Sequence, residues 1–276
     1  MFPIGFYIGL ILIGIFAGLA SGLLGVGGGF LMVPLQFFLF TSVGVDSDLA
    51  MMMSLGTSLA IIIPTASSSA YGHQKRNKNI IKPGIRLAVF GIIGGFCGGL
   101  LANMVPTRIL QIFFACLLIF VSLDMLFGSR TDGQKALISF NTLSVAIVGF
   151  LIGILSGMLG VGGGTFLIPS LCILFGFSLI DAIGTSSVFI AFSAIGGLIS
   201  YIYSGLGVNP MPYTLGYVSL INFVVISLFS VPMARIGANL AYKMPEKRLK
   251  QVFAIILIYM AIKMIGFDPI SMLLGI

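Results

Sequence analysis

The sequence predicts an all-α polytopic membrane protein built from two inverted-topology repeats. Three observations predict this fold class: the composition, the lengths of the apolar segments and an internal duplication. Of the 276 residues, 58% are hydrophobic and 8% are charged, whereas a soluble domain carries about 25% charged residues. Too few charges remain to cover a water-facing surface, which excludes a soluble enzyme, a nucleic-acid-binding domain and a disordered chain. The apolar runs are continuous and do not alternate, so they favour helices over a barrel.

A duplicated glycine cluster marks the two repeats. Residues 21–29 read Ser-Gly-Leu-Leu-Gly-Val-Gly-Gly-Gly, and residues 156–164 read Ser-Gly-Met-Leu-Gly-Val-Gly-Gly-Gly. A Gly-Thr-Ser motif follows in both copies, at 56–58 and at 184–186. The same motifs in the same order indicate an internal repeat. The first repeat is predicted to span 1–128 and the second 136–276, with a polar cytoplasmic linker at 129–135.

Five apolar segments form the first repeat. The first lacks the preceding basic residues of a secretory signal and is expected to remain as a helix. The second, which directly follows the glycine cluster, is shorter than the roughly 20 residues that a bilayer crossing needs. The other three are long enough to cross. In order, the segments are 3–24, 30–42, 49–70, 84–103 and 108–128.

The second repeat has the same five-segment pattern. Its segments are 137–158, 165–178, 181–203, 211–234 and 250–268. The short segment again follows the glycine cluster, so both short segments are predicted to be broken or re-entrant helices. About 8–10 transmembrane segments are therefore expected. Each repeat crosses either five or three times, and an odd number inverts the second repeat relative to the first.

The basic residues predict the orientation. The net charge is +7, and Lys and Arg gather in the loops around 71–86 and 235–250 and in the linker. Alternating crossings place nearly all 14 of them on one side. The positive-inside rule makes that side cytoplasmic, with both termini outside.

The glycine clusters are the predicted substrate site. Consecutive glycines can hold backbone N–H groups convergent, and the helix that follows presents its positive N-terminal end. Two such ends meeting near the midplane would bind a small anion without a buried Lys or Arg. The other use of glycine, close helix packing, is assigned to Gly14-Gly18-Gly22, Gly91-Gly95-Gly99 and Gly149-Gly153-Gly157. The predicted ligands are Gly25, Gly27, Gly28, Gly29, Gly160, Gly162, Gly163 and Gly164.

Hydroxyl groups complete the predicted site. Thr57, Ser58, Thr185 and Ser186 belong to the duplicated motif and could donate to an anion's oxygens, or could instead bond the helix carbonyl four residues earlier. Thr165 follows the second glycine cluster directly. No cofactor or metal site is expected.

Three other polar residues are interpreted outside this site. His73 is expected to be an interfacial side chain among basic loop residues. Gln36 and Asn222 either hydrogen-bond between helices or line a cavity.

These residues resemble the sulfite exporter TauE/SafE family over almost the whole chain. The similarity lies in two Gly-Val-Gly-Gly-Gly clusters, each followed by a Pro and then by Gly-Thr-Ser, and in Ala70-Tyr71-Gly72-His73. It implies a transporter of small sulfur-containing anions in the plasma (inner) membrane. One departure is that Tyr71-Gly72-His73 has no counterpart in the second repeat, where Ile199-Ser200-Tyr201 stands.

We expect a secondary transporter, acting as an exporter of sulfite or organosulfonates by alternating access. Its partners would be a small anionic substrate and the lipid bilayer, not nucleic acid, and a homo-oligomer is left open. The alternative is an anion channel, or a transporter of another small organic or inorganic anion. An enzyme is not expected, because the apolar segments lack a nucleophile paired with a base.

Overall fold

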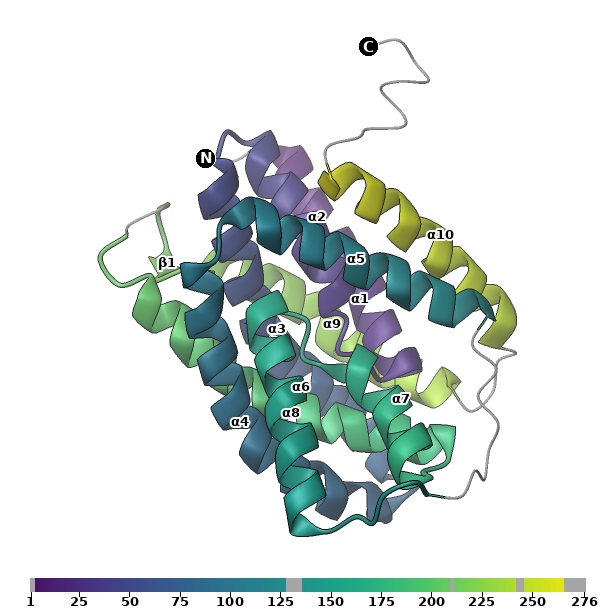
Figure 1. The fold of residues 1–276 in the computed structure, drawn as a ribbon. Coiled ribbons are helices and arrows are strands. Elements are labelled where there is room, and N and C mark those ends of the chain that lie inside the picture. Colours follow the sequence, from purple (N-terminus) through teal and green to yellow (C-terminus); the bar gives the residue numbers. More distant parts are fainter. Residues whose placement is uncertain (1–2, 128–135, 209–210, 242–245, 266–276) are drawn as a thin grey trace.

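The computed structural model describes residues 3–127, 136–208, 211–241 and 246–265. They form a bundle of helices with one small two-stranded ribbon (Figure 1). The prediction of an all-α protein is therefore confirmed. The predicted boundary at 128 and the linker at 129–135 lie outside the described residues.

The helices follow the predicted order. The first half contains α1 (Ile4–Leu24), α2 (Gly29–Ser42), α3 (Ser47–Gln74), the short 3-10 helix η1 (Lys78–Ile80), α4 (Ile81–Met104) and α5 (Thr107–Phe127). The second half contains α6 (Thr142–Leu159), α7 (Gly164–Phe175), α8 (Leu179–Ser204), β1 (Thr214–Leu215), β2 (Val218–Ser219), α9 (Leu220–Leu240) and α10 (Glu246–Ile265). Within the described part of the chain, six helices are long and apolar enough to cross a membrane, namely α1, α3, α4 with η1, α6, α8 and α9.

The short helices α2 and α7 double back along the helices before them. They have 14 and 12 residues, so they are about 21 and 18 Å long, less than the roughly 30 Å hydrocarbon core of a bilayer. The rings of Phe6 in α1 and Phe40 in α2 lie 6.4 Å apart, and those of Phe140 and Phe175 lie 5.0 Å apart. The predicted short helices thus form two hairpins, with a glycine cluster at each tip.

Small residues bring the long helices together. A Cβ atom on Gly18 of α1 would lie 2.5 Å from the carbonyl oxygen of Ser230 in α9. A Cβ on Gly153 of α6 would lie 2.5 Å from the carbonyl oxygen of Gly91 in α4. The predicted small-residue faces are therefore packing surfaces, which hold α1 along α9 and α6 along α4. Helices α3 and α8 contact each other; α3 also packs on α1 and α9, and α8 packs on α4 and α6, so the two helices form the centre of the bundle.

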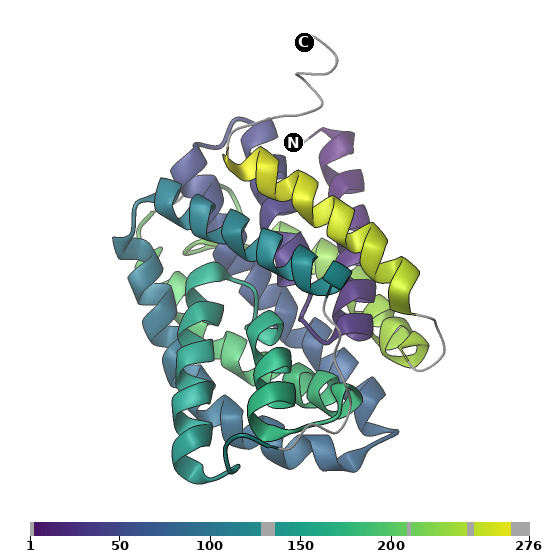
Figure 2. The ribbon, with the colours of Figure 1, turned by 45° about the vertical axis from the view of Figure 1, so that its right-hand side comes forward.

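Helices α5 and α10 lie side by side along one flank of the bundle, as Figures 1 and 2 show. At one end of the molecule, the last turns of α3 meet the second half of α9. The Arg235 guanidinium lies 5.0 Å from the centre of the Tyr71 ring, and Gly72 packs on Ala238. The described residues 235–241 of the second basic segment therefore lie at the same end as the start of the first, and we call this the basic end.

Candidate functional site

Glycine is required at the hairpin tips because of the backbone conformation there. Gly25 and Gly160 end α1 and α6 with φ values of 66° and 64°. Gly28 and Gly163 precede α2 and α7 with φ values of 75° and 79°. Residues with a Cβ rarely adopt these left-handed conformations, so the clusters turn the chain where other residues would strain it.

The two glycine clusters lie against each other. A Cβ on Gly29 would lie 2.6 Å from the Cα of Val161, and a Cβ on Gly164 would lie 2.7 Å from the Cα of Val26. Each tip therefore packs its backbone directly on the backbone of the other tip. The structure thus brings together the glycines that the sequence assigned to one site.

Two isoleucines fix the depth of this crossing. Ile62 lies near the middle of α3, and Ile190 lies near the middle of α8. A Cβ on Gly162 would lie 3.3 Å from the Cγ2 atom of Ile62 and 2.6 Å from that of Ile190. Because α3 and α8 run through the centre of the bundle, the clusters lie about halfway between its two ends.

Two serines join each tip to the other half of the chain. The Ser58 hydroxyl donates a 2.9 Å hydrogen bond to the carbonyl oxygen of Gly160. The Ser186 hydroxyl donates an equal bond, also 2.9 Å, to the carbonyl oxygen of Gly25. Carbonyls at a helix end need a partner outside the helix. Both hydroxyl protons therefore bond the carbonyls of the tips and not the carbonyls of their own helices. These bonds hold the tips in this conformation.

The threonines of the site differ between the two halves. Thr57 Oγ1 accepts a 2.9 Å hydrogen bond from the backbone N–H of Ser219. Thr165 Oγ1 and Thr185 Oγ1 are buried without a hydrogen-bond partner among the described residues. Buried polar atoms are nearly always paired, because leaving one unpaired costs free energy. These two hydroxyls are therefore available to a ligand.

The electrostatics of the crossing come from the backbone. Helices α2 and α7 have Gly28 and Gly163 as their N-cap residues, and neither residue supplies a side-chain cap. Their first N–H groups thus lack the usual side-chain acceptor, and each helix dipole is positive at this end. No Lys or Arg is among the buried residues of the described ranges. The arrangement suits a small anion.

The chain matches one protein family over nearly its whole length. The family model described as "Sulfite exporter TauE/SafE" matches residues 10–264. The chain belongs to this family. It is therefore a multi-pass membrane protein of the TauE/SafE type, which is a family of membrane transporters.

Several relatives carry the same kind of name. A "Probable membrane transporter protein" of Haemophilus influenzae is 37% identical over 256 residues, covering 92% of this chain and 96% of the relative. A relative of that description in Methanocaldococcus jannaschii is 28% identical, covering 93% of this chain and 94% of the relative. Another in Bacillus subtilis is 25% identical, covering 93% of this chain and 96% of the relative. No solved structure matches.

His73 of this TauE/SafE chain lies inside the protein, so its interpretation as a loop residue was wrong. Helix α3 continues to Gln74 and packs its last turns on α1 and α9, which leaves His73 only 2% exposed. Its Nε2 atom lies 3.1 Å from the carbonyl oxygen of Gly22. Its Cβ would lie 3.4 Å from a Cβ on Gly184. His73 therefore covers the second Gly-Thr-Ser motif at the basic end.

Tyr201 occupies the equivalent place at the opposite end. Its hydroxyl donates a 3.3 Å hydrogen bond to the carbonyl oxygen of Met158, and its Cβ would lie 2.9 Å from a Cβ on Gly56. The sequence already placed Ile199-Ser200-Tyr201 opposite Tyr71-Gly72-His73, but it predicted no role for Tyr201, because tyrosine does not resemble histidine. The spacing supports this correspondence, since Gly184 precedes Tyr201 by as many residues as Gly56 precedes His73.

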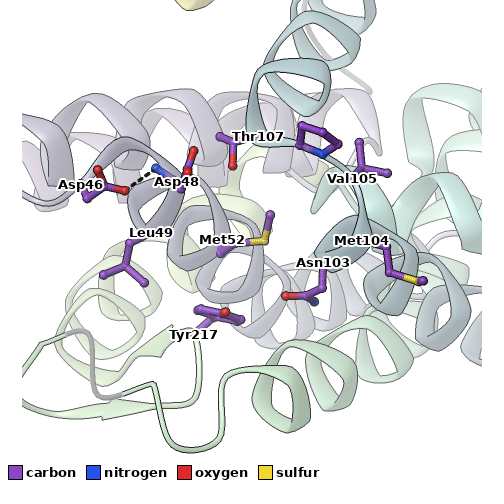
Figure 3. Close-up of a pocket in the computed structure, with 10 residues that line it drawn as sticks. Asp46, Asp48, Leu49, Met52, Asn103, Met104, Val105, Thr107 and Tyr217 are labelled. Carbon is purple, nitrogen blue, oxygen red and sulfur yellow. Dashed lines mark hydrogen bonds between the residues drawn. The ribbon is translucent and has the colours of Figure 1, made fainter.

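A pocket opens at the end away from the basic residues. It has a volume of about 510 Å³ and is formed by the start of α3, the end of α4, the turn into α5 and Tyr217 (Figure 3). Asp46 caps α3 there, with Oδ1 accepting a 2.9 Å bond from the N–H of Asp48. None of the predicted site residues lines this pocket. Its lining is Asp46, Asp48, Leu49, Met52, Asn103, Met104, Val105, Pro106, Thr107 and Tyr217.

Proposed function

We propose that this protein is a secondary transporter that exports small sulfur-containing oxyanions, such as sulfite or organosulfonates, by alternating access. The substrate is held between the two glycine clusters. The observation that carries the proposal is the meeting of two uncapped helix N-termini halfway through the bundle of a TauE/SafE protein. Backbone N–H groups and helix dipoles stabilise an anion there without a buried cation.

Exchanged contacts support two inverted repeats. Ser58 binds the tip of the second hairpin, and Ser186 binds the tip of the first. His73 and Tyr201 likewise cover the Gly-Thr-Ser motif of the other half, at opposite ends of the molecule. In addition, setting the two hairpins aside leaves α3, α4 and α5 in the first half and α8, α9 and α10 in the second, an odd number in each half. Halves of this kind can exchange inward-open and outward-open states by swapping conformations.

The orientation follows from charge. With the basic end in the cytoplasm, His73 closes the inner side of the path and Tyr201 closes the outer side. The pocket beyond Tyr201 then opens outside the cell and carries Asp46 and Asp48. Carboxylates at this mouth lower the local concentration of anions and oppose their return. This arrangement favours export.

Counterflow in proteoliposomes tests the proposal. Purified protein is reconstituted, the vesicles are loaded with unlabelled sulfite or methanesulfonate, and entry of the labelled anion is followed. A transporter gives saturable uptake that is accelerated by the anion inside. Large single-channel currents in planar bilayers would instead assign a channel, and an absence of flux for every sulfur oxyanion would contradict the substrate class.

A further inference from the structure

We propose that the side-chain amide of Gln36 is a second anion-binding group, which donates directly to an oxygen of the transported oxyanion on the outer side of the glycine clusters. This inference rests on the proposed function, whose substrate it describes more closely.

Gln36 belongs to a chain of buried polar groups between α2, α9 and α3. The Asn222 amide Nδ2 donates a 3.3 Å hydrogen bond to Gln36 Oε1. The Ser219 hydroxyl lies 3.4 Å from Asn222 Oδ1, and the Ser219 N–H donates to Thr57. Gln36 and Asn222 are 0% and 1% exposed. The hydrogen bond between helices, one of the two alternatives left open by the sequence, is therefore present.

One end of this chain of groups is unpaired. Among the described residues, the Nε2 atom of Gln36 is buried without a hydrogen-bond partner. A carboxamide has two N–H donors, and burying them unpaired costs free energy that an apolar side chain would avoid. The second hairpin avoids this cost, because buried Leu171, an apolar residue, stands at the equivalent position of α7. An unpaired donor kept in a transporter's interior is explained by a ligand that accepts from it.

The position of Gln36 fits the path of the substrate. It lies seven residues after Gly29 in α2, or about 10 Å along the helix from the glycine crossing. Thr57, at the other end of the chain of groups, directly follows Gly56, on which Tyr201 packs. Ser219 follows Tyr217, which lines the outer pocket, by two residues. The Gln36 amide therefore lies between the point where the glycine clusters meet and the outer pocket. It is on the inner side of Tyr201, which closes the path from outside.

The chemistry of the amide selects the ligand class. Neutral N–H donors bind the oxygens of an anion without the desolvation cost of burying a cation. A sulfite or sulfonate group presents three oxygens, any one of which can accept from Gln36 as the anion passes between the glycine crossing and the outer pocket. The asymmetry between Gln36 and Leu171 makes this a contact of the outer side only.

Anion binding by the full-length protein in lipid nanodiscs tests the inference, with sulfite and methanesulfonate as probes. The variants are Gln36→Leu, and Gln36→Leu combined with Asn222→Leu, which removes both bonded amides. The matched control is Gln111→Leu, because Gln111 is a buried glutamine whose Nε2 already donates a 3.2 Å bond to Ser47. Calorimetry gives the dissociation constant, and thermal unfolding without ligand gives the stability.

We expect the Gln36 variants to raise the dissociation constant by roughly tenfold or more, as for a lost bond to a charged group. The double variant should unfold no lower than the wild type without ligand, because it leaves no unpaired amide. Gln111→Leu should bind the probes as the wild type does. A Gln36→Leu dissociation constant within about twofold of the wild-type value, with the wild type binding saturably, overturns the role of Gln36 alone. A wild type that binds none of these anions overturns the proposed function as well.

Discussion

The hydroxyl of Ser186 donates a 2.9 Å hydrogen bond to the carbonyl oxygen of Gly25, which is 161 positions earlier in the chain. The bond joins the centre of the second half to the hairpin tip of the first, and Ser58 makes the reverse connection. Each tip is therefore held by the half of the protein to which it does not belong. Movement of one half relative to the other must strain or break these bonds.

The Ser186→Ala variant tests the strength of this connection. It leaves a buried helix-end carbonyl without its partner, and we expect the free energy of unfolding to fall by about 1–3 kcal/mol. Unfolding in detergent with increasing denaturant measures the loss. Ser67→Ala is the control, because the Ser67 hydroxyl is exposed and bonds only within its own helix, to Ile63. Equal midpoints for the two variants would show that the connection contributes nothing.

The Gly28→Ala variant tests whether the hairpin tip needs space as well as a left-handed backbone. A Cβ on Gly28 would lie 2.5 Å from the carbonyl oxygen of Ala17, so α1 must move to admit it. Gly44 has a φ of 86° but nothing within 4 Å of its Cβ position, so Gly44→Ala adds backbone strain alone. We expect Gly28→Ala to melt well below Gly44→Ala and to lose transport. The requirement for space would be refuted by matching melting temperatures and normal flux.

The Thr185→Val and Thr57→Val variants should have opposite effects. Thr185 Oγ1 has no partner among the described residues, so valine should leave stability unchanged or raise it while weakening anion binding. Thr57 accepts from Ser219, so valine there should lower the free energy of unfolding by about 1–3 kcal/mol. Thermal unfolding with and without sulfite measures both effects. A fall in stability for Thr185→Val with intact binding would contradict a ligand role for this hydroxyl.

The Tyr201→Phe variant tests the outer closure. It removes the hydroxyl that donates to Met158 but keeps the ring on Gly56. We expect the closure to open more often, so that an impermeant thiol reagent added outside labels a cysteine introduced by Thr57→Cys several-fold faster. The background chain has alanine in place of the native cysteines, Cys97, Cys116 and Cys172. An unchanged labelling rate would show that this hydrogen bond does not hold the closure.

The predicted substrate role of the glycine and hydroxyl residues stays a prediction, but the structure limits how each can act. Ser58 and Ser186 have their protons engaged, whereas Thr165 and Thr185 do not. Sequence reasoning could not separate these cases, because a hydroxyl's partner depends on which carbonyl a distant segment brings near it. The expected alternative, bonding within the same helix, is seen at Ser187, which donates to the carbonyl oxygen of Ile183.

The sequence by itself determined the class of the protein, its two glycine-tipped short helices and its small-residue packing faces. These features depend on local properties, namely the length of apolar runs, the left-handed backbone that favours glycine and the size of a side chain. Only the tertiary structure decided that the short helices fold back as hairpins, that Tyr201 and His73 each pack on the Gly-Thr-Ser motif of the other half, and that the Gln36 amide is left with an unpaired donor. Each of these follows from packing between helices far apart in the chain, which no spacing of residue types specifies.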